Sequence, residues 1–459
     1  MFKNWEVKMR MRRTLAIFMV VAMVFCYIPN TEFSDVAAAE TTKVEAETTS
    51  VVDSTENRES LFVDMPKEGL WSTAAIKLAV SNGLLNGFVE KGETYIRPND
   101  SLTRAQMATI VNRAFGAQET ATLSGVADVS KNAWYYKDMQ KALKMGTMKL
   151  DNKMRPNDSI TRQEAFTILG RALKMEGGTN ADLAKFNDAS SVASWATSGM
   201  GAMVKAGYIN GDDNMLTPTD SMTRAQFATI MNNVIKEYIS NAGTFTELSS
   251  GNVTVNVPGV TLKDATITGD LIVGDGVGDG NLTLNNVVVK GNLIIRGGGV
   301  DSIIITGGSV NGKVIIAKID GKVRVFAQDG AEIEVVEIID GKDHVIIEGI
   351  VGIVEISSQN TPVIIRNANV KTIEVKTQGA GNITIADTSK VNNIVVGASS
   401  TGTKISVAGT VTNLETSAQD TNISGAGTVT NAKINNGANG TSITTPNTKI
   451  DNKAEGVTH

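Results

Sequence analysis

One seven-residue block occurs three times in this chain of 459 residues. It stands at 98–104 as Pro-Asn-Asp-Ser-Leu-Thr-Arg, at 156–162 as Pro-Asn-Asp-Ser-Ile-Thr-Arg and at 218–224 as Pro-Thr-Asp-Ser-Met-Thr-Arg. The intervals between successive copies are nearly equal. Repetition at such a spacing indicates one small structural unit that has been copied, and it constrains the fold more than any other feature of the sequence.

Each block predicts the start of a helix. A threonine is followed three residues later by Gln or Glu, which is the pattern of a capping box. The three pairs are Thr103 with Gln106, Thr161 with Glu164, and Thr223 with Gln226. Apolar residues then recur at helical spacing and at the same four offsets in every copy. These stripes are Met107, Ile110, Val111 and Ala114; Ala165, Ile168, Leu169 and Ala172; and Phe227, Ile230, Met231 and Val234.

A first helix with one tryptophan is predicted upstream of each block. The tryptophans are Trp71, Trp134 and Trp195, and an acidic residue precedes each of them, at Asp64, Asp128 and Asp188. Glycines mark a turn between the two helices, at Gly83 and Gly87, at Gly146, and at Gly207 and Gly211. A helix pair of this size cannot bury its apolar face alone, so we expect the three pairs to share one core.

These motifs together resemble the S-layer homology family of bacterial surface proteins. The resemblance covers three repeats, at 61–117, 124–176 and 185–240. The chain departs from the family pattern at Val126, where Phe is usual, and at Gln106 and Gln226, where Glu is usual. In the second repeat, a short Gly-Thr-Met-Lys segment at 146–149 replaces the longer glycine loop that is usual in the family.

The resemblance implies an all-α pseudo-threefold trimer of repeats within one chain. It also implies grooves that bind secondary cell-wall polysaccharide, which often carries pyruvate ketals, without a covalent bond. Arg104, Arg162 and Arg224 would then meet the anionic sugar. The expected location is the wall or surface layer of a bacterium of Gram-positive type.

The residues themselves favour an anion at these arginines. A cation in the first turn of a helix faces the positive end of the helix dipole, which costs about 0.3–1 kcal/mol. A bound carboxylate would relieve that cost, because helix-start amides and a guanidinium both donate hydrogen bonds to it. The alternative is a salt bridge from each arginine to the aspartate three residues before its capping threonine. Those aspartates are Asp100, Asp158 and Asp220.

The tryptophans and the upstream aspartates complete the candidate polysaccharide-binding set. Apolar neighbours at helical spacing, such as Ala75 and Leu78 after Trp71, favour packing of the tryptophans in the core, whereas stacking on sugar rings is the alternative. The full candidate set is Arg104, Arg162, Arg224, Asp64, Asp128, Asp188, Trp71, Trp134 and Trp195.

The composition changes from Thr244 onward, where aromatic residues nearly vanish and Val, Ile, Thr, Asn and Gly dominate. Apolar runs at 269–273, 291–295 and 312–316 recur at nearly equal intervals, and shorter runs after 363 recur at about half that interval. Short β-branched strands separated by Gly or Asn are typical of a parallel β-helix. We therefore predict an all-β, right-handed parallel β-helix over 245–445, with β-sandwich modules as the alternative.

The end of this region is expected to be less regular. Ile and Val become sparser after Thr401, so we expect the solenoid to fray there and residues 446–459 to form a disordered tail. An open end of a β-helix exposes an unpaired strand edge, which makes self-association a further expectation.

The β-helical region shows no clear catalytic constellation. Its aspartates at 264, 270, 301, 320, 340 and 343 are spread along the sequence, which favours a solvated face. Asp275 and Asp279 stand among glycines and could bind calcium, but two carboxylates are too few for a strong site, and a glycine-rich loop is the favoured explanation. Only His344 and His459 are present, which disfavours histidine catalysis or a multi-histidine metal site. We expect no enzymatic activity, metal or cofactor; a wall-anchored polysaccharide lyase or hydrolase, or an adhesin, is the alternative.

The N-terminal segment predicts export. Five bases precede the apolar run 15–28, and three alanines at 37–39 offer a cleavage site, so residues 1–39 are predicted to be a secretory signal peptide and 40–60 a flexible linker. A retained membrane anchor is the rival prediction. Cleavage would remove Cys26, the only cysteine, together with a net charge of +2, and would change the net charge from −5 to −7. An acidic surface disfavours nucleic acid and anionic membranes as partners.

Overall fold

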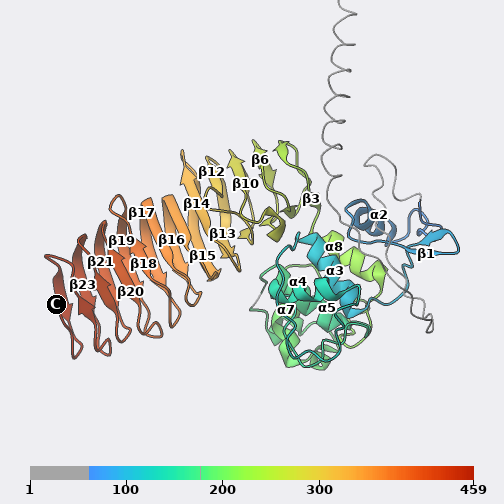
Figure 1. Ribbon diagram of the computed structural model, residues 1–459, viewed down its shortest axis with the longest axis horizontal. Helices are drawn as coiled ribbons and strands as arrows, with labels where there is room; N and C mark the ends of the chain where they lie inside the picture. Colours follow the sequence, from blue (N-terminus) through green and yellow to red (C-terminus); the bar gives the residue numbers. More distant parts are fainter. Residues whose placement is uncertain (1–60, 176) are drawn as a thin grey trace, which may run out of the picture. The chain divides into compact units, whose positions relative to one another are not determined.

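The computed structural model describes residues 61–175 and 177–459, so the predictions of a signal peptide (1–39) and a linker (40–60) lie outside it. The described chain forms a mostly helical module and then a long stack of β-strands (Figure 1). Within these residues, no helix combines the length and the apolar character that crossing a membrane requires.

The helical module contains two longer helices from each repeat, the short α6, one 3-10 turn and one small sheet. Its helices are α2 (Thr73–Ser81), α3 (Arg104–Ala114), α4 (Tyr136–Lys144), α5 (Arg162–Ala172), α6 (Asn180–Leu183), the 3-10 turn η2 (Ala189–Ser191), α7 (Ser194–Lys205) and α8 (Arg224–Val234). Strands β1 (Phe88–Glu90) and β2 (Glu93–Tyr95) form an antiparallel hairpin between α2 and α3. The family resemblance had implied an all-α module, but this hairpin shows that the module is not purely α-helical.

The capping boxes that the sequence predicts are present at the starts of α3, α5 and α8. The hydroxyls of Thr103, Thr161 and Thr223 accept the backbone N–H of the residue three positions later, whose side chain in turn accepts the threonine N–H. The twelve stripe residues of these helices are all buried, at 9% exposure or less, and belong to one apolar cluster. The shared core of the three repeats is thus confirmed.

The second part is a β-solenoid, drawn from yellow-green to red in Figure 1. Its strands are β3 (Glu237–Ile239), β4 (Gly243–Phe245), β5 (Val253–Val255), β6 (Val260–Lys263), β7 (Thr266–Ile267), β8 (Leu271–Val273), β9 (Leu282–Asn285), β10 (Val288–Val289), β11 (Leu293–Ile295), β12 (Ile304–Thr306), β13 (Ser309–Ala317), β14 (Val323–Gln328), β15 (Glu332–Asp340), β16 (Val345–Ile356), β17 (Val363–Val375), β18 (Ile383–Ile385), β19 (Lys390–Val396), β20 (Lys404–Val407), β21 (Thr410–Thr416), β22 (Asn422–Ser424), β23 (Thr428–Ile434), β24 (Ser442–Ile443) and β25 (Lys449–Asn452).

The strands of successive coils pair in parallel, which confirms a β-solenoid and excludes the β-sandwich alternative. Leu271 lies beside Leu293, and Leu293 lies beside Val314, so the interval at which the apolar runs recur in the sequence is the length of one coil. Farther along, Val363 pairs with Ile383 while Ile373 pairs with Ile394. The more closely spaced runs after 363 therefore alternate between two sides of each coil.

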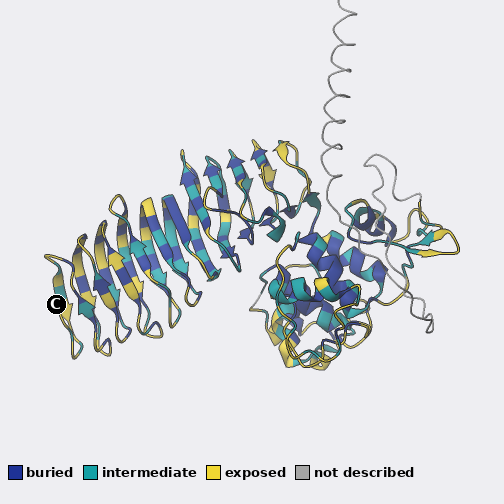
Figure 2. Ribbon diagram, in the orientation of Figure 1, coloured by how far each residue is buried: buried dark blue, intermediate teal, exposed yellow. Residues whose placement is uncertain are grey.

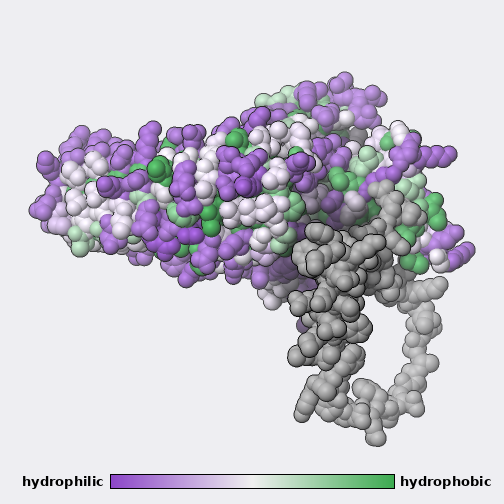
Figure 3. Space-filling model, turned by 90° about the horizontal axis from the view of Figure 1, so that it is seen from above, coloured by the Kyte–Doolittle hydropathy of each residue, from purple (hydrophilic) through white to green (hydrophobic). Residues whose placement is uncertain are grey.

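Buried and exposed residues alternate along strands such as β14, β20 and β21 (Figure 2), whereas β5, β8 and β11 are buried at every position. The inward residues stack coil upon coil into one continuous apolar cluster that runs from Ile239 to Ile443. Outward residues are mostly polar, and the solenoid surface seen in Figure 3 is largely hydrophilic, with apolar residues in small patches.

The expected fraying after Thr401 and the disordered tail are contradicted by the structure. Regular coils continue to β25, which pairs with β23 through Ala432 and Ile450. Buried threonines at coil corners donate their hydroxyls to backbone carbonyls: Thr403 donates to the Ser400 carbonyl at 2.6 Å and Thr441 to that of Ala438 at 2.7 Å. A hydroxyl that bonds to the backbone can be buried, so loss of Ile and Val does not end the coil.

The two modules share apolar and polar contacts. Ile272 and Ile294 of the solenoid belong to the apolar cluster of the helical module. The Arg296 side chain, fully buried, donates to the carbonyls of Met145 and Ala172, both at 3.3 Å.

Candidate functional site

The starts of α3, α5 and α8 are joined in a closed cycle of backbone hydrogen bonds. The N–H of Leu102 donates to the Met222 carbonyl, that of Met222 to Ile160, and that of Ile160 back to Leu102, at 2.9–3.0 Å. The backbone N–H groups of the three box arginines form a second cycle, which runs between the repeats in the opposite direction. Arg104 donates to the Asp158 carbonyl, Arg162 to that of Asp220 and Arg224 to that of Asp100. The repeated blocks thus join the repeats to one another.

The arginine side chains also cross from one repeat to another. The Nε–H of Arg104 donates to the Met154 carbonyl at 2.9 Å and that of Arg162 to the Leu216 carbonyl at 2.8 Å. Arg224, which is 4% exposed, donates from Nε to the Ile96 carbonyl at 2.7 Å and from Nη2 to the Asn86 carbonyl at 2.6 Å. These arginines therefore hold the loops of neighbouring repeats.

The alternative of a salt bridge to the aspartate in the same repeat is wrong for Arg104. Its carboxylate partner is Glu164 of the second repeat, with 2.8 Å between Nη1 and Oε1. Arg104, in the first turn of α3, is thus paired with Glu164, which caps α5. The spacing of residues within one repeat could not predict this contact.

The three upstream aspartates position the same loops. Asp64 accepts the backbone N–H of Ile96 at 2.6 Å and of Arg97 at 2.9 Å. Asp128 does the same with Met154 and Arg155, and Asp188 with Leu216 and Thr217. The second residue of each pair has a positive φ, between 44° and 53°, which a non-glycine residue adopts only when its surroundings hold it. Each carboxylate therefore fixes a loop conformation.

A cavity of about 260 Å³ lies where the second repeat meets Trp195 of the third. Its charged lining comes from α3, the loop after α4, and α5: Arg104, Lys149, Asp151, Lys153, Arg155, Glu164 and Arg171. Five of these seven groups are basic. Sequence reasoning did not single out Lys149, Lys153 and Arg155, although three bases close together in one loop were the available signal.

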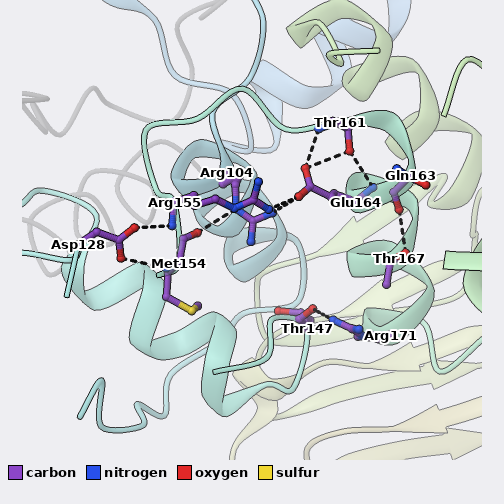
Figure 4. A network of polar contacts seen from close by, with 10 residues as sticks. All are labelled: Arg104, Asp128, Thr147, Met154, Arg155, Thr161, Gln163, Glu164, Thr167 and Arg171. Carbon is purple, nitrogen blue, oxygen red and sulfur yellow. Dashed lines mark hydrogen bonds and ion pairs between the residues drawn. The ribbon is translucent and has the colours of Figure 1, made fainter. Parts of the chain in front are cut away.

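Glu164 is the centre of this site (Figure 4). The guanidinium groups of Arg104 and Arg155 converge on its carboxylate, which also accepts the Thr161 N–H at 2.9 Å. Partial burial opposes ionisation of Glu164, but the Thr161 amide and the two arginines outweigh it, so the pKa of Glu164 is lowered. Burial lowers the pKa of Arg104, and Glu164 opposes that change. The corresponding Gln106 and Gln226 cap their helices without bringing a charge.

The tryptophans are exposed, so the prediction that they pack in the core is wrong. The exposed fractions are 65% for Trp71, 44% for Trp134 and 53% for Trp195. Trp71 and Trp134 also lie two residues before α2 and α4, whereas Trp195 lies within α7. Smaller residues such as Ala75 fill the core instead, which leaves the indole rings accessible to a ligand.

Asp275 and Asp279 of the solenoid have basic partners. Arg296 Nε lies 2.7 Å from Asp275, and Lys318 Nζ lies 2.6 Å from Asp279. These cations occupy the carboxylates that calcium would need, so the loop explanation fits better than a calcium site. Within residues 61–175 and 177–459, no group of three or more His, Cys, Asp or Glu side chains is arranged to hold a metal ion.

The helical module matches a known family. The S-layer homology domain family matches at residues 61–108, 127–166 and 185–228. Three curated relatives contain similar sequence: exoglucanase XynX of Acetivibrio thermocellus (31% identity over 36% of this chain), an amylopullulanase of Thermoanaerobacterium thermosulfurigenes (29% over 36%) and the surface-layer 125 kDa protein of Lysinibacillus sphaericus (29% over 38%). The match spans only 16%, 9% and 15% of these relatives' own lengths.

Proposed function

We propose that this chain, which carries three S-layer homology domains followed by a parallel β-solenoid, anchors non-covalently to secondary cell-wall polysaccharide and holds its solenoid at the bacterial surface as a structural module. S-layer homology domains bind cell-wall polysaccharide, and one of the similar proteins is a surface-layer protein. The observation that carries the proposal is the basic cavity of the second repeat, with the exposed Trp195 at its edge.

The chemistry of this cavity fits an anionic sugar. Arg155 is half exposed, and Lys149 and Lys153 extend the positive charge along the same loop. A ketal carboxylate would accept hydrogen bonds from these groups, while the indole of Trp195 would lie against the apolar face of a sugar ring. In this proposal the box arginines and the upstream aspartates act mainly by holding the loops that form the groove.

The closed cycle of hydrogen bonds supports a pseudo-threefold arrangement, in which each repeat contributes one groove. The second groove would be formed with Trp195, and its counterparts with Trp134 and Trp71. We further propose a right-handed solenoid, export by the signal peptide and a wall of Gram-positive type, as the family resemblance and the N-terminal sequence imply.

An anchored lyase or hydrolase is the rival function. Several relatives are named as glucanases or as an amylopullulanase, but the similarity covers less than two fifths of this chain. The family match lies within residues 61–228, before the solenoid begins. These names therefore add no support for chemistry in the solenoid.

Removing the indole rings tests the anchor. We expect Trp195→Ala to weaken binding of the full chain to intact wall sacculi about tenfold or more, because buried aromatic contacts dominate such interfaces. The triple change at Trp71, Trp134 and Trp195 should abolish co-sedimentation. Val300→Ala, at an apolar residue that is 45% exposed in the solenoid, is the matched control. Binding that is unchanged in the triple variant, or that survives removal of the polysaccharide from the sacculi, would contradict the proposal.

Glu164→Gln tests the role of charge. The other two repeats show that Gln maintains the helix cap, so the fold should persist while Arg104 and Arg155 lose their carboxylate. We expect affinity for a carboxylated wall polymer to rise roughly 3–10-fold, and Gln106→Glu to lower it, because a nearby unit charge contributes about 1 kcal/mol in a partly exposed site. Titration calorimetry of both variants measures this. Equal affinities would show that the anion does not approach these arginines.

The lowered pKa of Glu164 also gives this residue a pH signature. Its contribution to stability is complete above the ordinary carboxyl pKa of about 4.3 and is lost as pH falls through the lower folded value. The wild-type chain should therefore lose stability in that acidic window, relative to pH 7, by more than Glu164→Gln does. Urea unfolding at pH 7 and at acidic pH measures the difference.

A further inference from the structure

One outer face of the solenoid is hollowed over five successive coils. The hollow has a volume of about 880 Å³ and is lined by β13, β15, β16, β17 and β19. Ser309 pairs with Glu332, and Ile350 pairs with Asn369, which in turn pairs with Lys390. The inward residues between the lining side chains are all buried: Val310, Ile333, Val351, Val370 and Val391.

Charge is distributed asymmetrically along this face. Glu332 and Glu334 lie on the second of the five coils, and Lys371 and Lys390 lie on the fourth and fifth. Between them, the third coil presents Ile350, which is 64% exposed. The same coil has Gly352 beside Glu334, where a Cβ would lie 2.5 Å from the Glu334 carbonyl oxygen. The order along the solenoid is therefore acid, apolar, base.

These four charged side chains form no ion pair with any residue between 61 and 459 that the structure describes. The next row of side chains on the same coils is different. Lys313 lies 2.9 Å from Glu337 and 2.8 Å from Glu355, and Lys376 lies 2.6 Å from Glu355. The hydrogen bond to Glu355 raises the pKa of Lys376. The row that contains Lys313 and Glu355 therefore pairs its charges within the chain, whereas the charged side chains of the hollow face stay unpaired among the described residues.

We propose that the hollow face binds the same face of a second copy of this chain, with the two solenoids antiparallel. A two-fold axis at the coil of Ile350 would exchange the acidic and basic ends of the face. Glu334 would then meet Lys371 of the second copy, and Lys371 would meet its Glu334. Ile350 would lie against Ile350 of the second copy, as a residue on the axis of a symmetric dimer must.

The charge order selects this arrangement over its rivals. A parallel dimer would place Glu332 against Glu334 of the second copy, and like charges at an interface are unfavourable. An anionic polymer lying along the face would meet Glu332 and Glu334 at one end, and a cationic polymer would meet the two lysines at the other. A second copy turned by a half-rotation matches both ends at once.

The expected dimer is weak. Five coils at ~4.8 Å spacing and three residues of each strand give a face of roughly 200 Å² per copy. Stable dimers bury about 800 Å² per partner, so we expect a Kd on the order of 0.1–1 mM. Any tethering that raises the local concentration of the chain would favour pairing. The inference does not depend on which polymer the helical module binds.

Charge reversal tests the pairing in solution. Sedimentation velocity of the full chain at concentrations up to roughly 0.5 mM should show reversible dimers. Glu334→Lys and Lys371→Glu should each weaken dimerisation at least tenfold, because both symmetry-related pairs become repulsive. An equimolar mixture of the two variants should dimerise again, since each then presents the charge that the other needs. The double variant should likewise recover. A monomeric wild-type chain, or a mixture that stays monomeric, would overturn the proposal.

A cysteine at the two-fold axis gives an independent test. In a chain with Cys26→Ser, Ile350→Cys should form a disulfide-linked dimer on mild oxidation, since position 350 faces its own copy. Val395→Cys, which is also outward-facing and is 39% exposed on β19, is the matched control and should cross-link far less. Equal cross-linking at the two positions would overturn the proposal. So would a wild-type chain that binds soluble wall polysaccharide through this face and remains monomeric.

Discussion

Replacement of Arg224 by alanine is expected to lower the free energy of unfolding of the helical module by about 3–5 kcal/mol. The guanidinium is buried, donates to the carbonyls of Ile96 and Asn86, and lies over the Phe88 ring with 4.9 Å between Cζ and the ring centroid. Truncation would leave the carbonyls of the buried Ile96 and the half-buried Asn86 without these donors, and would open a cavity between the third repeat and the first. The variant should therefore weaken the contact between the third repeat and the first.

Tryptophan fluorescence measures this effect selectively. The chain has four tryptophans, at positions 5, 71, 134 and 195, so the solenoid has none. Urea unfolding followed by fluorescence reports on the helical module even if the solenoid stays folded. Arg155→Ala is the control, because its side chain is 49% exposed and Glu164 keeps Arg104 as a partner, so we expect a loss of about 1 kcal/mol or less. A loss for Arg224→Ala no larger than that of the control would show that the crossing arginine does not hold the module together.

Local sequence patterns were sufficient for the capped helices and for the coil length of the solenoid. A capping box depends on residues three positions apart, so Thr103 and Gln106 could be paired from the sequence alone. Coil length in a solenoid is likewise a repeat distance along the chain, which is why the spacing of the apolar runs predicts the register of Leu271 with Leu293. Both patterns are set by neighbours that the sequence itself places together.

Contacts between repeats could not be obtained in this way. The pairing of Arg104 with Glu164 depends on how two repeats meet, and 60 residues separate them in the chain. The same limit applies to Asp64, which binds backbone N–H groups 32 and 33 residues away. These residues were predicted as ligand-binding groups because their repetition was visible, whereas their partners were not.

The tryptophans and the C-terminal coils show a second limit. Helical spacing of apolar residues after Trp71 correctly indicated a buried face, but small residues such as Ala75 occupy that face. After Thr401 the loss of Ile and Val suggested fraying, yet Ile405 and Ile423 continue the inward stack, and the hydroxyl of the buried Thr403 donates to a corner carbonyl. Composition alone cannot distinguish a polar residue that faces solvent from one that is buried in a coil with its polar group hydrogen-bonded to the backbone.

Ile373→Lys in the solenoid is expected to cost about 4 kcal/mol or more, because it buries an ammonium group in a dry apolar stack. Ile373 is fully buried and lies between Val354 of the preceding coil and Ile394 of the following coil. A solenoid coil contacts only its neighbours, so the damage should begin as local opening of these adjacent coils. Hydrogen exchange should show that the backbone amides around residues 354 and 394 lose protection before those of more distant coils do.

Val395→Lys is the matched control for this change. Val395 faces outward on the next coil, beside Glu374 and Glu415, so a lysine there gains two carboxylate neighbours and should leave stability within about 0.5 kcal/mol of the wild type. The two variants place the same side chain on neighbouring coils and differ only in the direction that it points. If both unfolded equally, alternation of inward and outward residues would not be what stabilises the coils. If neither variant unfolded, the apolar stack would have to open locally around the buried lysine while the rest of the solenoid stayed folded.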